Sequence, residues 1–167
     1  SVLPSLTMPA VLGDSSGPTP AKTVPSHFSR VSSASQRDVE VVFGKEDDNH
    51  FWIGNPLDME TKVCLNLKSL TERSIGVFGK SGTGKTFLTR LLLIGILQSD
   101  LASTLVFDMH SEYGWSGTSE RGGQVKGLKQ LFGSKVAVFT VDPEASRRRG
   151  VSVDFVVRIG YDEISAD

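Results

Sequence analysis

Cysteine is nearly absent from this chain of 167 residues. The single thiol, Cys64, excludes an internal disulfide framework, so we expect a protein of a reducing compartment, the cytoplasm. Cys64 lies in an alternating run, which indicates a small strand residue rather than a reactive thiol. Long hydrophobic runs are also lacking. The longest, residues 91–97, is too short to cross a bilayer, and no signal peptide is visible, so we expect no membrane insertion.

An excess of charge of either sign is missing as well. The chain has 18 Lys plus Arg against 19 Asp plus Glu, a net charge of −1. A balanced chain has no bulk attraction to nucleic acid or to an anionic membrane, so any polyanion must be bound by a local patch. The one basic cluster, residues 147–149, is interpreted as a solvated turn. Contact with DNA phosphate or with a neighbouring subunit's nucleotide is the alternative.

Aromatic residues are scarce at the N-terminal end. Residues 1–38 hold five of the seven prolines and nine serines, with Phe28 as the only Phe, Trp or Tyr. Such a segment buries too little apolar surface to offset its ordering entropy. We therefore predict a disordered linker over 1–38 and a folded domain over 39–167. The chain starts at Ser1 without an initiator methionine, so we expect the natural N-terminus to lie upstream.

Apolar periodicity predicts a small β region followed by an α/β unit. Strands are expected at 39–43, 51–53, 62–67, 74–78, 103–108, 135–141 and 151–159. Helices are expected at 85–98 and 124–132. The first helix is apolar nearly all round, which is typical of a helix packed between a sheet and other elements. The alternation of strand and helix from residue 74 predicts a parallel sheet with helices on its faces.

A glycine-rich phosphate loop joins the strand expected at 74–78 to the helix expected at 85–98. The pattern G-x-x-x-x-G-K-[ST] is matched in full by Gly79, Lys80, Ser81, Gly82, Thr83, Gly84, Lys85 and Thr86. In such a loop the backbone N–H groups face a phosphate, the lysine reaches the β- and γ-phosphates, and the hydroxyl of Thr86 is placed to bind magnesium. We therefore expect ATP and Mg²⁺ as cofactors, bound by these residues and by Phe87, which follows them.

Other classes of nucleotide-binding protein fit less well. The only D-x-x-G lies upstream of the loop at residues 14–17, and no N-K-x-D occurs, which disfavours a GTPase. The sequence R-G-G-Q at 121–124 lacks the Leu-Ser start of the transporter ATPase signature and follows the P-loop too closely, so we interpret it as a loop that enters a helix.

The stretch V-F-D-M-H-S-E-Y-G at 106–114, together with the P-loop, resembles the central ATPase domain of the HerA/FtsK family of DNA-pumping motors. That family has a G-x-[ST]-G-[ST]-G-K-[ST] loop, a long apolar helix and a strand ending in D-x-H-x-E-Y. Residues 53–54 and 63–67 are similar to its lead-in strands. The resemblance covers about 39–167 and is closest to the HerA-type helicases of prokaryotes. It implies part of a RecA-like P-loop NTPase parallel sheet, preceded by a small β region and the linker.

The resemblance implies ATP-driven translocation or unwinding of double-stranded DNA by a homo-oligomer, expected to be a hexameric ring. DNA is a partner by resemblance alone. The family's Walker B strand and arginine finger come later in a longer chain, so we expect both beyond Asp167 and take this chain as the N-terminal part of the ATPase core. The alternatives are a secretion or conjugation motor, a small-molecule phosphotransferase, and a fragment that binds ATP without hydrolysing it.

Three acids end or follow predicted strands: Asp108, Asp142 and Asp154. RecA-like ATPases, which this family resembles in its core, can carry their catalytic glutamate at the end of the strand after the P-loop helix, so Glu112 is a candidate for activating water. Asp108 is the candidate for fixing the loop or the magnesium shell, and Lys85 completes the expected catalytic set. A capping Asp108 and a solvated Glu112 are the structural alternative. In a small complete NTPase Asp142 would be the magnesium partner, whereas the family implies a turn residue.

Overall fold

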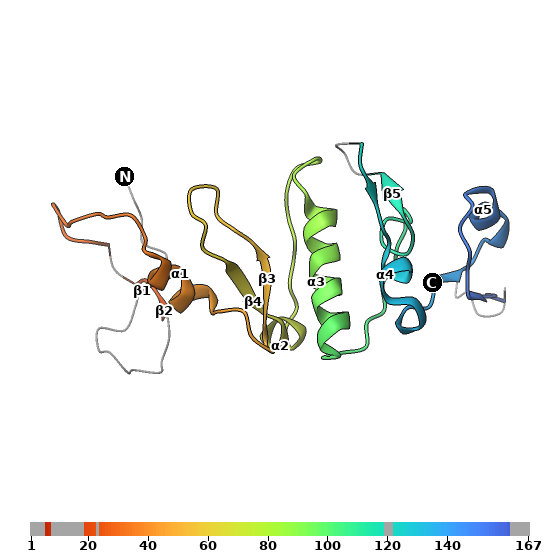
Figure 1. The fold of residues 1–167 in the computed structure, drawn as a ribbon, viewed down its shortest axis with the longest axis horizontal. Coiled ribbons are helices and arrows are strands. Elements are labelled where there is room, and N and C mark those ends of the chain that lie inside the picture. The colour runs from red at the N-terminus through yellow and green to blue at the C-terminus, as the bar shows by residue number, and fades with distance from the viewer. Residues whose placement is uncertain (1–5, 8–18, 23, 119–121, 161–167) are drawn as a thin grey trace. The chain divides into compact units, whose positions relative to one another are not determined.

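The computed structural model describes residues 6–7, 19–22, 24–118 and 122–160 (Figure 1). Over these ranges the chain is mixed α/β, with short helices and two-stranded sheets. It divides into two compact units, Ser1–Ile75 and Gly76–Asp167, and each is described by itself. Among the helices of the described ranges, none has the length and apolar character needed to cross a membrane.

The first unit contains an antiparallel hairpin. Strand β3 (His50–Gly54) pairs with β4 (Val63–Asn66), and Trp52 lies opposite Cys64. Both strands were predicted from the sequence, the second from its alternating pattern, and both are confirmed. Cys64 is only 1% exposed, and burial raises the pKa of its thiol, as suits a small residue packed inside a sheet.

Residues 39–43, predicted as a strand, belong instead to helix α1 (Gln36–Phe43). The hydroxyl of Ser35 accepts a hydrogen bond from the N–H of Asp38, and the Asp38 carboxylate accepts one from the N–H of Ser35. This capping box satisfies two of the free N–H groups at the helix start. The strand prediction was wrong because local capping outweighs the strand preference of a valine-rich run.

The rest of the first unit consists of short elements. Strands β1 (Leu6–Thr7) and β2 (Thr19–Pro20) form an antiparallel pair within the segment predicted as a linker. Helix α2 (Leu67–Thr71) follows β4 directly, and the side chain of Asn66 caps it by accepting the N–H of Ser69 at 2.9 Å.

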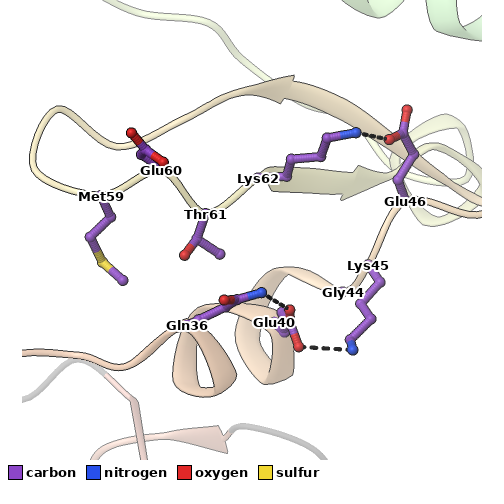
Figure 2. A pocket seen from close by; sticks show the side chains of 9 residues that line it. All are labelled: Gln36, Glu40, Gly44, Lys45, Glu46, Met59, Glu60, Thr61 and Lys62. Carbon is purple, nitrogen blue, oxygen red and sulfur yellow. Dashed lines mark hydrogen bonds and ion pairs between the residues drawn. The ribbon is translucent and has the colours of Figure 1, made fainter.

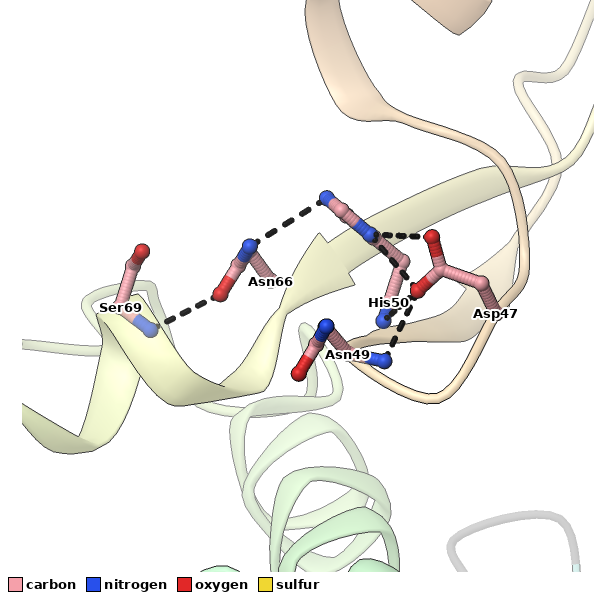
Figure 3. A network of polar contacts seen from close by, with 5 residues as sticks. All are labelled: Asp47, Asn49, His50, Asn66 and Ser69. Carbon is pink, nitrogen blue, oxygen red and sulfur yellow. Dashed lines mark hydrogen bonds and ion pairs between the residues drawn. The ribbon is translucent and has the colours of Figure 1, made fainter.

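A chain of polar contacts connects the turn before β3 to the start of α2 (Figure 3). The Nδ1 atom of His50 lies 2.9 Å from Oδ1 of Asp47, which also accepts the N–H of Asn49. On the other side of the ring, Nε2 lies 3.4 Å from Nδ2 of Asn66. The hydrogen bond from His50 holds the pKa of the Asp47 carboxyl below its usual value.

A cavity of about 590 Å³ lies beside α1 and the connection from β3 to β4 (Figure 2). Lys45 forms an ion pair with Glu40 at 3.0 Å, and Lys62 pairs with Glu46. Both lysines that line the cavity are therefore engaged by glutamates, so the described part of its wall leaves no free lysine for an anionic ligand.

The second unit is centred on α3 (Lys85–Ser99), the longest helix of the described residues and green in Figure 1. The helix starts at Lys85, the residue predicted from the P-loop pattern, so this prediction is confirmed. Leu92, Leu93 and Ile96 are its buried large residues, and α3 contacts α4 (Leu128–Phe132). Asp100, in the left-handed region with φ of 50°, ends the helix.

The strands predicted on either side of α3, at 74–78 and 103–108, do not form. A strand requires ladder hydrogen bonds to a neighbour, and neither segment has a strand partner among the described residues. Their large apolar side chains are exposed, with Phe78 92% and Phe107 87% accessible. Both segments are apolar in sequence, but the described packing does not bury their side chains.

Two further predicted elements are shorter than expected. The helix predicted over 124–132 begins only at Leu128. The residues before it form strand β6 (Gln124–Val125), which makes an antiparallel pair with β5 (Gly117–Thr118). Gly127 then forms an extended N-cap whose N–H donates to the side chain of Gln130. After α4, a single 3₁₀ turn, η1 (Gly133–Lys135), occupies the start of the strand predicted over 135–141.

Parallel pairing, predicted for this unit, occurs near its C-terminal end. Strand β7 (Phe139–Thr140) pairs in parallel with β8 (Phe155–Val156), and the rings of Phe139 and Phe155 stack with centroids 5.2 Å apart. Both strands are shorter than the predicted 135–141 and 151–159. Helix α5 (Pro143–Arg148), which was not predicted, lies between them in sequence and completes a strand–helix–strand unit.

Asp154 joins β8 to the residue before β7 and to α4. Its Oδ2 accepts the N–H of Val138 at 2.8 Å, and its Oδ1 pairs with the ammonium of Lys129 at 2.9 Å. Lys129, and then the Val138 N–H, hold the pKa of Asp154 below its usual value. A depressed pKa in the folded state means that the contribution to stability exists above the unfolded-state pKa and is lost as pH falls through the folded-state pKa.

We therefore expect Asp154→Asn to lower the melting temperature of the full-length protein at neutral pH. The difference from wild type should shrink in the acid range below about pH 4, where the wild-type carboxyl also becomes neutral. Thermal unfolding followed by circular dichroism at several pH values measures both effects. Asp58→Asn, at an exposed turn, is the matched control. A difference that stays constant across the pH range would contradict the assignment.

Candidate nucleotide-binding site

Two glycines of the P-loop adopt backbone conformations that other residues disfavour. Gly82 and Gly84 have φ of 80° and 88°, in the left-handed region that side chains disfavour. Gly84 is the N-cap of α3 and provides no side-chain cap, so the first N–H groups of the helix are not taken up by a capping side chain. Free N–H groups at the positive end of a helix dipole form an anion site.

The lysine of the loop folds back over the loop's own backbone. The ammonium of Lys85 donates to the carbonyl of Lys80 at 2.6 Å, and the hydroxyl of Thr83 donates to the same oxygen at 2.7 Å. These contacts place the charge of Lys85 against the turn that the glycines form. The ring of Phe87, on the first turn of α3, is 61% exposed.

The structure brings Thr86 and Glu112 together, although 26 positions separate them in sequence. The hydroxyl of Thr86 donates its proton to Oε2 of Glu112 at 3.2 Å. A hydroxyl has one proton and two lone pairs, so this bond leaves the lone pairs of Thr86 available to a cation. A hydroxyl oxygen is a ligand that Mg²⁺ accepts, so Thr86 fits a magnesium ion, with the carboxylate of Glu112 beside it.

Asp108 organises the loop that carries Glu112. Its Oδ1 accepts the N–H of Glu112 at 2.8 Å, and its Oδ2 accepts those of Tyr113 at 2.9 Å and Gly114 at 3.4 Å. Both carboxylate oxygens are thus engaged by backbone N–H groups of the turn. Of the two roles expected for this residue, the contacts favour fixing the loop over ligating a metal.

Two arginines that the sequence did not single out individually also contact this loop. Arg90 on α3 donates through Nη2 to the carbonyl of Glu112. Arg149, after α5, donates through Nη1 to the hydroxyl of Ser111 at 2.9 Å. The available signal was spacing: Arg90 follows Thr86 by one helical turn and therefore lies on the same face of α3. Arg149 belongs to the cluster interpreted as a solvated turn.

The other two candidate acids are engaged elsewhere in the second unit. Asp142 is the N-cap of α5 and accepts the N–H of Ala145 at 2.9 Å, with Pro143 in the first turn. Asp154 holds β8 as described above. Within the described ranges, neither carboxylate contacts a residue of the P-loop.

Comparison with protein-family models matches residues 51–167 to the family described as "Helicase HerA, central domain". This chain belongs to that family. The match includes the hairpin from Phe51 onward, the P-loop and the loop of Glu112, and it confirms the resemblance drawn from the two motifs. Membership makes the chain a P-loop ATPase domain of the HerA/FtsK type in general. Neither the curated proteins nor the solved structures contained a match to the chain.

Proposed function

We propose that this HerA-family chain binds ATP with Mg²⁺ in the cytoplasm and, within the full-length protein, hydrolyses it to move double-stranded DNA. The observation that carries the proposal is the contact between Thr86 and Glu112. It joins the residue expected to ligate magnesium to the residue expected to activate water, beside a loop shaped for phosphate.

The position of each residue suggests its role in ATP binding and hydrolysis. The N–H groups of the loop and the start of α3 bind the phosphates, and the ammonium of Lys85 counters their charge. Thr86 would hold the metal through its hydroxyl oxygen, with Glu112 beside it. Magnesium, when bound, neutralises charge on the β- and γ-phosphates. Glu112 orients the attacking water and accepts its proton, while Asp108 keeps the loop of Glu112 in shape.

The proposal includes a RecA-like parallel sheet and a homo-oligomer, a hexameric ring. Family membership supports both, since the matched family is that of a helicase. The described second unit agrees with the sheet in having one parallel pair, β7–β8, and a helix that starts at the P-loop. DNA as the translocated substrate rests on the family, because the charge of the chain is balanced.

Steady-state hydrolysis by the full-length protein tests the proposal. We expect magnesium-dependent ATP turnover that duplex DNA stimulates, with stimulation falling as salt is raised because phosphate contacts release counterions. Single-stranded DNA and an unfolded polypeptide serve as comparison substrates. Stimulation by either of these in place of duplex DNA would assign the chain to a conjugation or secretion motor. Turnover that needs a small phosphate acceptor would assign it to the phosphotransferases.

A further inference from the structure

Helix α3 contacts both the side chain and the main chain of Glu112. Thr86, on the first turn of α3, binds its side-chain carboxylate, and Arg90, one turn later, binds its backbone carbonyl. Residues four apart on a helix share a face, so both contacts come from one side of α3. Two bonds therefore connect Glu112 directly to α3, one to its side chain and one to its main chain.

The remaining contacts hold the loop to other parts of the unit. Asp108 accepts N–H groups within the loop, and the N–H groups of Leu128 and Lys129 at the start of α4 donate to the carbonyls of Tyr113 at 2.8 Å and Gly114 at 3.0 Å. These bonds satisfy free N–H groups at the N-terminus of α4. They shape the loop and attach it to α4, which in turn contacts α3, so they position Glu112 against the P-loop helix only indirectly.

The turn just before Glu112 needs such support. Ser111 has φ of 57°, a left-handed conformation that a non-glycine residue adopts at a cost. Arg149 contacts the Ser111 hydroxyl, whereas Arg90 contacts the next residue from α3. Without Arg90, the hydrogen bond of Thr86 at 3.2 Å would be the described contact left between α3 and Glu112.

The position of Arg90 leaves part of its own guanidinium group without a hydrogen bond. Its side chain is half-buried, and its Nε is buried without a hydrogen-bond partner among the described atoms. An unpaired buried donor disfavours the folded state, and the bond from Nη2 to the carbonyl of Glu112 offsets part of that cost. The group of Arg90 that does find a partner is the one aimed at Glu112.

We propose that Arg90 is a positioning residue for the Glu112 carboxylate. By holding the main chain of Glu112 against α3, it sets the distance from the carboxylate to Thr86 and to the phosphates bound at the P-loop. It touches a carbonyl rather than a reacting atom, so its effect passes entirely through Glu112. This inference rests on the proposed function, in which Glu112 activates water.

The test is a double-mutant cycle in the full-length protein, with kcat, KM and the affinity for a non-hydrolysable ATP analogue as readouts. Arg90→Met should lower kcat by roughly tenfold to a hundredfold, the effect of displacing a catalytic group by about 1 Å, with analogue affinity unchanged. Arg90→Lys should recover part of kcat, since lysine restores one donor. Combined with Glu112→Gln, Arg90→Met should cause no further loss, because its effect requires the carboxylate.

Arg37→Met, an exposed arginine on α1, is the matched control and should leave kcat unchanged. An equal loss from Arg90→Met in both backgrounds would assign the residue a general structural role and overturn the inference. So would a loss confined to analogue affinity. If Arg90→Met fails to fold, Arg90→Lys and Arg90→Gln carry the same comparison. Failure of the proposed function is distinct: Glu112→Gln alone would then leave turnover intact, and the role of Arg90 would fall with it.

Discussion

We expect Lys85→Ala to abolish ATP binding and to reduce ATP turnover by a hundredfold or more in the full-length protein, without unfolding it. Removing one charge-stabilising donor from a reaction site typically costs about 10²–10³ in rate. The fold should survive because the Lys85 ammonium contacts only the loop carbonyl of Lys80 among the described residues, and no packed core depends on it. Binding of a fluorescent ATP analogue, steady-state hydrolysis and circular dichroism measure the three quantities.

The matched control for this change is Lys80→Ala in the same loop. Lys80 takes part in the described contacts through its backbone carbonyl, which alanine retains. Its side chain is exposed, so its removal should leave binding nearly intact. Near-normal turnover in Lys85→Ala would refute the assignment of this loop as the phosphate site. A loss of equal size in both variants would show that the loop needs positive charge in general rather than Lys85 in particular.

We expect Glu112→Gln to cut turnover in the full-length protein by about a hundredfold, the order of magnitude for losing a positioned base. Affinity for ATP should stay close to normal, because the lost group acts on water rather than on the bound phosphates. Glutamine keeps an oxygen that can accept the Thr86 hydroxyl, and its backbone carbonyl still meets Arg90. Single-turnover hydrolysis together with analogue binding separates the two effects.

Asp142→Asn is the comparison that decides between the two interpretations of this chain. Asparagine caps a helix about as well as aspartate, so α5 should persist and turnover should change little. The reverse pattern, with loss of magnesium-dependent binding in Asp142→Asn and a mild effect in Glu112→Gln, would support a small complete NTPase. Weak effects at both positions would mean that the catalytic acids lie outside the described residues, and the role of Glu112 would be withdrawn.

Local patterns predicted some elements correctly and failed at others for identifiable reasons. The strands of the hairpin β3–β4 followed from short apolar runs, the second of them alternating, and the start of α3 followed from the P-loop pattern. These patterns depend on residues close in sequence. The strand prediction for residues 39–43 failed because Ser35 and Asp38, upstream of the valine run, form a capping box that starts a helix. Helix α5 was missed although Asp142 and Pro143 are a recognised helix start.

The sequence by itself determined the P-loop, the helix that follows it and the family, because each depends on residues that are contiguous or regularly spaced in the chain. Only the tertiary structure decided which acid reaches the P-loop. Glu112 meets Thr86 and Arg90 across 26 and 22 positions of chain, through a turn closed by Asp108. Asp142 and Asp154 carry the same carboxyl chemistry, but backbone geometry directs them to a helix cap and a strand contact. Sequence spacing does not encode such long-range distances, since they depend on how the intervening loop folds back on the helix.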